Sequence, residues 1–302
     1  MRNTELVGLE PIQDIIELTL ITSYVKGEKT VKLLVVAEPE SGKTELMKKY
    51  RNNRGVHVRR RLTAYGILTD LLQGKIHTLF DKPKRLGHIL VYEYSSVFSY
   101  KQNTVDSTIE FLCALTEEGL SEESSYWIGG DQLKKFKGLK GGVIAGINPF
   151  GFFTSGGKVK ANLHKGGWLS RNIVVSYELS EELASKIHDI IKKGEYRPGR
   201  KFVNVINLEL PKKRLAIEIP EDLAEQIKDL ARNVAEEYSE KLKPYKLRGF
   251  RLHKSLISLV KASALRDGRK TVNKEDIARI EFLSQWMNLK MHRLKSNYTF
   301  YR

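Results

Sequence analysis

Residues 31–50 read VKLLVVAEPESGKTELMKKY, and this stretch decides the fold. Its first six residues, VKLLVV, are too few and too rich in β-branched side chains for a helix. They predict a buried strand of a parallel sheet. The last seven, TELMKKY, begin a helical pattern. A strand and a helix joined by a short glycine-containing loop form the setting in which many proteins bind the phosphates of a nucleotide.

The loop itself reads AEPESGKT at residues 37–44, with Ala37 where such loops usually begin with glycine. Gly42 lets the backbone approach a phosphate closely, Lys43 reaches the β and γ phosphates, and the Thr44 hydroxyl is a ligand for Mg²⁺. We therefore predict that ATP and Mg²⁺ are bound by Glu38, Pro39, Glu40, Ser41, Gly42, Lys43, Thr44 and Glu45. The acids at positions 38 and 40 are unusual neighbours for a polyanion.

Strand-like and helix-like segments alternate on both sides of this loop. Strands are expected at 55–62, 88–92, 141–149 and 171–179, and helices at 10–24, 63–73 and 104–118. This alternation predicts the α/β class, with a parallel sheet and flanking helices. From residue 180 the pattern is mostly helical, with helices expected at 180–193, 221–240, 251–265 and 273–294 and an extended connector at 195–219. We expect two domains, an α/β nucleotide-binding domain at 1–179 and a basic helical domain at 180–302.

A carboxylate near the loop would complete a metal site. The sequence ILVYEYSS at 89–96 ends an apolar strand in a single acid, Glu93. If this strand lies beside the phosphate loop, Thr44 and Glu93 can together hold Mg²⁺. The alternative is a solvent-facing strand end. Tyr94 occupies the position where a second acid often stands.

The composition of the chain narrows the classes of molecule that it is expected to bind. The 302 residues carry a formal net charge of +16, and residues 241–302 hold 16 Lys and Arg against 4 Asp and Glu. Such an excess favours a polyanionic partner, DNA or RNA before an acidic membrane surface; the alternative is a solvated, lysine-rich surface. No apolar run approaches the roughly 20 residues that span a bilayer, so no membrane association is expected. The start of the chain lacks the pattern of a signal peptide, and Cys113 is the single cysteine. We expect a cytoplasmic protein.

Several later segments, taken in order, resemble the AAA+ ATPases, and most closely the branch that contains the minichromosome maintenance replicative helicases. The resemblance covers roughly residues 5–290. GLEPIQDIIELTLITSYVKG (8–27) resembles the helix that leads into that family's nucleotide site. VIAGINP (143–149) resembles its first sensor strand, and WLSRNIVVSYEL (168–179) its arginine-finger segment. RLHKSLISLVKAS (251–263) resembles its second sensor helix, and SYWIGGDQLKKFKG (125–138) its pore hairpin.

The resemblance implies an AAA+ core followed by a helical lid, and a ring or spiral, hexameric in the simplest case, that acts on DNA. It implies a catalytic set of Lys43, Glu93, Asn148, Arg171 and Arg251. It also implies DNA contacts from Lys134, Lys135 and Lys137. Tyr94 departs from the family, which has a catalytic Glu there, and this predicts slow hydrolysis.

Other interpretations stay open at this stage. Arg171 could pair with a core carboxylate, Arg251 could lie on a solvated helix face, and the hairpin lysines could protect an edge strand from aggregation. The leading function is a DNA-acting ATPase of the helicase, translocase or helicase-loader type. The first alternative is a nucleotide-gated DNA-binding switch that barely hydrolyses ATP. A third is an AAA+ module that remodels protein or activates transcription.

Overall fold

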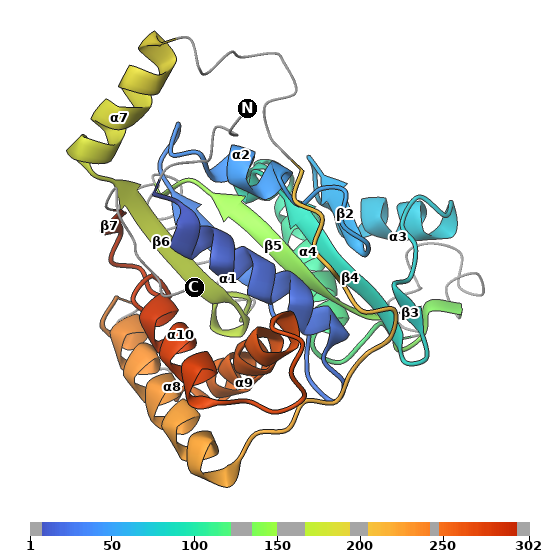
Figure 1. Ribbon diagram of the computed structural model, residues 1–302. Helices are drawn as coiled ribbons and strands as arrows, with labels where there is room; N and C mark the ends of the chain where they lie inside the picture. The colour runs from blue at the N-terminus through green and yellow to red at the C-terminus, as the bar shows by residue number, and fades with distance from the viewer. Residues whose placement is uncertain (1–7, 122–134, 150–166, 194–204, 242–247, 295–302) are drawn as a thin grey trace.

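The computed structural model describes residues 8–121, 135–149, 167–193, 205–241 and 248–294. A seven-stranded sheet forms its centre, in the order β2-β4-β5-β1-β6-β7, with β3 antiparallel on β4 and every other pairing parallel (Figure 1). The strands are β1 (Leu33–Ala37), β2 (Val56–Arg59), β3 (Phe80–Asp81), β4 (Lys84–Val91), β5 (Lys140–Ile147), β6 (Ile173–Leu179) and β7 (His292–Leu294). The predicted α/β class with a parallel sheet is confirmed.

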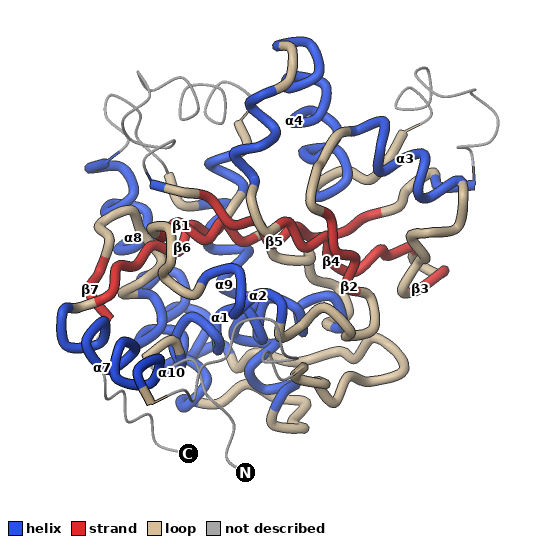
Figure 2. Tube along the Cα trace, turned by 90° about the horizontal axis from the view of Figure 1, so that it is seen from above, coloured by secondary structure: helices blue, strands red, loops and turns tan. Residues whose placement is uncertain are grey.

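Helices cover both faces of this sheet. Figure 2 shows the sheet edge-on, with α3 and α4 on one side and α1 and α2 on the other. The helices are α1 (Glu10–Ile21), α2 (Lys43–Lys48), α3 (Ala64–Leu72), α4 (Gln102–Thr116), α7 (Glu181–Lys192), α8 (Glu221–Lys241), α9 (Phe250–Arg266) and α10 (Lys274–Ser284). Short 3-10 segments are η1 (Thr22–Tyr24), η2 (Tyr94–Ser99) and η5 (Leu169–Arg171). Because β1 is covered on both faces, all five of its residues are buried, which explains its uninterrupted apolar sequence.

The connector carries the chain across the molecule before the helical part begins. Near α2, the Ile206 amide donates to the Lys49 carbonyl (2.8 Å), and further along the Leu215 amide donates to the Tyr24 carbonyl (2.9 Å). The connector then enters α8. The connector runs past α1 from the edge where the parallel strands end towards the edge where they begin. It therefore delivers α8, α9 and α10 to the edge away from α2 (Figure 1).

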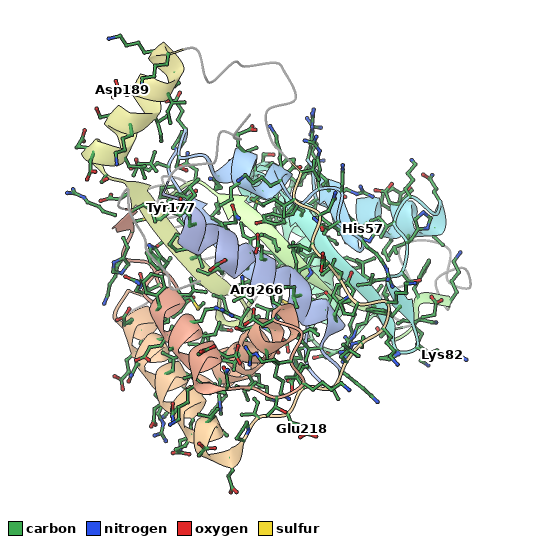
Figure 3. The ribbon with its side chains drawn as sticks, viewed as in Figure 1. His57, Lys82, Tyr177, Asp189, Glu218 and Arg266 are labelled. Atoms are coloured by element: carbon green, nitrogen blue, oxygen red, sulfur yellow. The ribbon has the colours of Figure 1, made fainter. Side chains whose placement is uncertain are left out.

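The helical part packs against the sheet's own helices. Arg266 at the end of α9 donates to Asp14 of α1 (3.1 Å) and is labelled between these helices in Figure 3. Tyr238 of α8 donates to the Val174 carbonyl of β6 (3.0 Å). One hydrophobic cluster runs from the sheet into α8, α9 and α10. These contacts do not confirm a lid over residues 38–42, and the boundary between 1–179 and 180–302 stays a prediction.

The helix predicted at 273–294 is wrong in its second half. α10 ends at Ser284, and the chain then turns back to the sheet and forms β7. Trp286 and Met287 are buried there, and the Trp286 carbonyl accepts a hydrogen bond from the Ser176 amide of β6 (3.0 Å). Packing against β6 therefore outweighs the local helical pattern. No helix in the described residues is both long enough and apolar enough to cross a membrane.

A buried histidine joins α1's end to the sheet. His88 of β4 is fully buried; its Nε2 lies 3.0 Å from the Val31 carbonyl and its Nδ1 lies 3.2 Å from the Ser23 hydroxyl. The carbonyl can only accept, so Nε2 carries the proton and Nδ1 accepts from Ser23. Gly142 on β5 is required beside it, because a Cβ there would lie 2.5 Å from the imidazole.

Burial lowers the pKa of His88 to about 4, and this predicts acid sensitivity. The pKa of His88 in the folded protein lies below the unfolded value of about 6.5. The contribution of neutral His88 to the free energy of unfolding, about 3 kcal/mol, is therefore complete above about pH 6.5 and is lost as the pH falls towards about 4. Urea unfolding from pH 7 to 4.5 should show His88→Gln losing less stability than the wild type. His57, whose pKa is also lowered by burial, is present in both proteins. Parallel pH profiles would contradict the assignment.

Candidate functional site

The loop between β1 and α2 is organised around a buried lysine. Lys43 is 6% exposed, and its ammonium donates to the carbonyls of Ala37 (3.0 Å) and Ile147 (2.9 Å). Burial lowers the pKa of Lys43, and the nearby Glu93 opposes this effect. In the described part of the chain, no carboxylate lies within ion-pair distance of Lys43. A buried ammonium held by two carbonyls is a site that favours an anion.

Backbone conformation shapes the rest of the loop. Gly42 precedes α2 with φ +78°, where L-residues are strained, and Glu40 also adopts positive φ, at +62°. Tyr177 of β6, labelled in Figure 3, donates to the Ser41 carbonyl (3.3 Å) and holds the loop from the neighbouring strand. The Ser41 hydroxyl is buried and has no hydrogen-bond partner among the described residues. The loop thus holds an orphan polar group two residues before Lys43.

Glu93 and Asn148 follow the ends of neighbouring strands at the same edge. Val91 of β4 pairs with Ala145 of β5, so Glu93 lies level with Ile147, which itself pairs with Val36 of β1. The strand that Glu93 follows is not a direct neighbour of β1, because β5 lies between them. Two strand spacings separate the backbones of Glu93 and β1 by about 10 Å.

The exposed Glu93 carboxylate accepts hydrogen bonds from the amide and hydroxyl of Ser95. Asn148 is partly buried, directly after the Ile147 carbonyl that accepts from Lys43. Of the two residues predicted to hold Mg²⁺, Thr44 lies in the first turn of α2 and Glu93 follows β4. The described residues contain no cluster of three or more His, Cys, Asp or Glu side chains that could hold a metal.

Gly146 is a residue of this site that the sequence reasoning missed. A Cβ at this position would lie 2.6 Å from the Tyr92 carbonyl, 3.2 Å from Lys43 Cδ and 3.3 Å from Met47 Sδ. The Tyr92 carbonyl belongs to the backbone and cannot move aside cheaply. Glycine inside a strand often marks such a close approach, and the GGVIAGINP pattern carried this signal.

Tyr94 points into the core. Its side chain is fully buried, stacks on Trp168 (ring centroids 6.2 Å apart) and meets Phe98 edge to face (5.7 Å). Burial raises the pKa of Tyr94 above its ordinary value. The phenol therefore stays protonated and cannot act as a general base for the loop.

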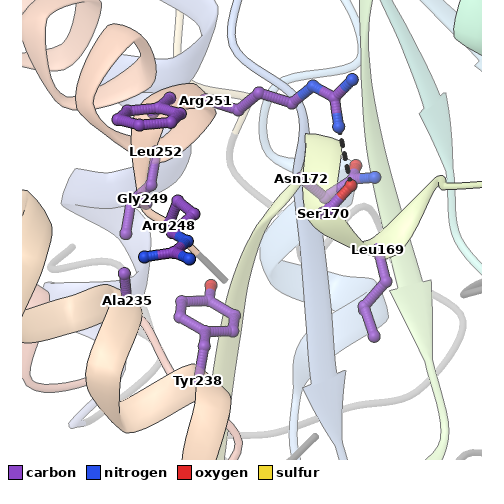
Figure 4. A pocket seen from close by; sticks show the side chains of 10 residues that line it. Leu169, Ser170, Asn172, Ala235, Tyr238, Arg248, Gly249, Arg251 and Leu252 are labelled. Carbon is purple, nitrogen blue, oxygen red and sulfur yellow. Dashed lines mark hydrogen bonds between the residues drawn. The ribbon is translucent and has the colours of Figure 1, made fainter. Parts of the chain in front are cut away.

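Arg171 and Arg251 are not brought to the loop between β1 and α2. Ile173, two residues after Arg171, pairs with Leu33 at the start of β1, whereas the loop follows Ala37 at its end. Four residues of strand separate these levels by about 13 Å. Arg251 at the start of α9 donates to the Ser170 hydroxyl (3.1 Å), which Figure 4 shows as a dashed line. Both arginines therefore lie at the opposite edge of the sheet.

The predicted hairpin falls mostly outside the described residues, and Lys134 with it. Lys135 and Lys137 are described and exposed, just before β5. The Lys135 ammonium lies over the ring of Phe136, 5.1 Å from its centroid. Trp168 and Trp286 are buried and pack in the core.

Comparisons with known proteins give no information on this site, so its interpretation rests on the geometry. A scan against protein-family models found no match, and a search of curated proteins found no significant one.

The packing of Tyr94 predicts opposite results for two substitutions. Tyr94→Phe should change the free energy of unfolding by less than about 1 kcal/mol, because the hydroxyl is buried without a partner among the described residues. Tyr94→Glu should lower it by more than about 3 kcal/mol, because it buries an unpaired carboxylate between Phe98 and Trp168. Urea unfolding followed by circular dichroism measures both. A Glu variant as stable as the wild type would show that position 94 faces solvent.

Proposed function

We propose that the chain binds ATP with Mg²⁺ at residues 38–45 and hydrolyses it slowly, acting on DNA as an AAA+-type ring or spiral oligomer. The observation that carries this proposal is the Lys43 ammonium, buried, held by two backbone carbonyls and without a carboxylate partner among the described residues. An ammonium has three donors, and a bound phosphate would accept from the third.

Each group at this edge has a role that its position supports. Lys43 would hold the β and γ phosphates, and the Ser41 hydroxyl is available to a phosphate oxygen. Thr44 and Glu93 would hold Mg²⁺, which neutralises charge on the phosphates when bound. Asn148, beside the Ile147 carbonyl, would orient the attacking water. Gly146 keeps Lys43 and the end of β4 close together.

Arg171 and Arg251 suit a site shared between two copies. Since both lie at the far edge of the sheet, neither reaches the loop of its own chain. In a head-to-tail assembly, however, that edge of one copy meets the loop of the next. There Arg171 would act as an arginine finger, and Arg251 would lie beside the loop of the neighbouring copy.

Charge supports DNA as the substrate. The chain carries a net charge of +16, with a large share of its excess in residues 241–302. Lys135 and Lys137 are exposed at the end of the predicted hairpin. Lysines of this kind contact the phosphate backbone without reading its sequence.

The burial of Tyr94 favours one second candidate. With no acid beside Glu93, turnover should be slower than the typical enzyme median of about 10 s⁻¹. In the limit, the chain would be a nucleotide-gated DNA-binding switch that recruits partner proteins. The two candidates share the nucleotide site and differ in turnover.

Removing the Lys43 side chain tests the nucleotide site. Lys43→Ala should weaken binding of a fluorescent ATP analogue by at least about tenfold, because a charge-assisted contact to phosphate is lost. The control is Lys75→Ala, which truncates a lysine whose side chain is 65% exposed after α3 and should bind as the wild type does. Equal affinity in the Lys43 variant would overturn the proposal.

ATP turnover with and without single- and double-stranded DNA tests the rest. Stimulation by DNA is expected. Replacing Lys134, Lys135 and Lys137 by Ala should weaken DNA binding and reduce its salt dependence by roughly 0.7–0.9 log units for each lost contact. DNA binding without turnover would favour the switch. A chain that neither binds DNA nor responds to it would contradict the DNA-acting function.

A further inference from the structure

A cationic pocket lies at the edge of the sheet away from the phosphate loop. Its cavity has a volume of about 240 Å³. We define the cationic pocket by the five cations that line it, which are Lys29, Lys32, Arg171, Arg251 and Lys254. They come from the segment before β1, from η5 and from α9. Among the described residues of the lining, Glu117, just after α4, is the one acid.

The Glu117 carboxylate does not neutralise this pocket. Glu117 pairs with Lys29 and Lys32. Arg171, Arg251 and Lys254 have no carboxylate partner in the described ranges. Burial lowers the pKa of Lys32 to about 8, although Glu117 opposes this. The Nε of Arg171 is buried and lacks a hydrogen-bond partner within the part of the chain described. Cations gathered at such a site favour an anionic occupant.

The phosphate-loop edge shows the reverse arrangement. Glu38 and Glu40 are exposed there and form no ion pair with any residue that the structure describes. Next to a nucleotide these carboxylates repel phosphate, so nucleotide binding does not explain them. They cannot reach the cationic pocket of their own chain, because β1 separates the two edges by about 13 Å. A second copy can bring the two edges together.

We propose that Glu38 and Glu40 of one copy dock into the cationic pocket of a second copy, where they pair with Arg251 and Lys254. This inference rests on the proposed function, since it places Arg171 of the second copy beside the nucleotide of the first. The contact is heterologous, and its repetition gives a ring or a filament. The loop glutamates then select the neighbouring subunit and leave phosphate binding to Lys43.

Charge reversal on each edge tests the pairing. The acidic edge is reversed in Glu38→Lys/Glu40→Lys, and the basic edge in Arg251→Glu/Lys254→Glu. Sedimentation velocity of the full chain, with and without Mg²⁺ and a slowly hydrolysed ATP analogue, measures assembly. Each variant alone should associate at least about a hundredfold more weakly than the wild type, because like charges meet. An equimolar mixture of the two should assemble again, since each then presents the charge that the other lacks.

Controls separate this pairing from effects of net charge. Glu225→Lys/Asp229→Lys changes the net charge as much as the acidic-edge reversal, on exposed positions of α8, and should assemble as the wild type does. Normal assembly of either reversed variant, or no recovery in the mixture, would overturn the proposal. So would binding of inorganic phosphate in the pocket together with unaffected assembly, which would make it a site for small anions.

Nucleotide binding on the same samples distinguishes this proposal from the proposed function. If the mixture recovers assembly but no protein binds the ATP analogue, the docking stands and the nucleotide site fails. If the wild type binds the analogue yet stays monomeric at every concentration, the nucleotide site stands and the docking fails.

Discussion

The ammonium of Lys43 is the contact on which the candidate site depends. It joins the first residue of the loop to the end of β5 through the carbonyls of Ala37 and Ile147. Gly146 leaves room beside these bonds for the lysine stem and for the Tyr92 carbonyl just after β4. Three strand ends are thereby held around one buried charge. Hydrogen bonds to two carbonyls offset part of the desolvation of that charge, and an anion would offset more.

The parallel sheet then divides the chemistry between two edges. All strands of a parallel sheet end on the same side, so groups that follow strands gather there and groups that precede strands gather opposite. Glu93 and Asn148 follow β4 and β5, whereas Arg171 precedes β6. The connector at 205–219 adds to this division, because it carries α9 and Arg251 to the far edge. A single chain therefore separates the candidate phosphate-binding loop from Arg171 and Arg251, which is why a second copy enters both proposals.

Local sequence patterns predict part of the fold and of the candidate site. The unit of β1, loop and α2 follows from a short apolar run, one glycine and a helical pattern, all within 20 residues. The end of α10 at Ser284 does not, because burial of Trp286 against β6 depends on contacts more than 100 residues apart in sequence. The cationic pocket is also invisible locally, since Lys29, Glu117, Arg171 and Lys254 come from four separate segments. The loop sequence showed Gly42. A glycine inside the pattern GGVIAGINP marked position 146 as well, but the Tyr92 carbonyl and the Lys43 stem that it accommodates are visible only in the structure.

Tyr94 shows why a single position beside an acid cannot be interpreted from sequence spacing. After Glu93 the chain enters η2, and this turn sends the Tyr94 ring inward onto Trp168. The Trp168 carbonyl accepts from the Arg171 amide (3.0 Å) and from the Asn172 side chain (2.6 Å). Tyr94, which follows Glu93, is thus packed on the segment that carries Arg171. A carboxylate at position 94 would have to leave the core to face the loop, and the stacking on Trp168 would be lost. Tyr94 therefore supplies a packing contact between the segment after β4 and the segment before β6, and it supplies no proton acceptor.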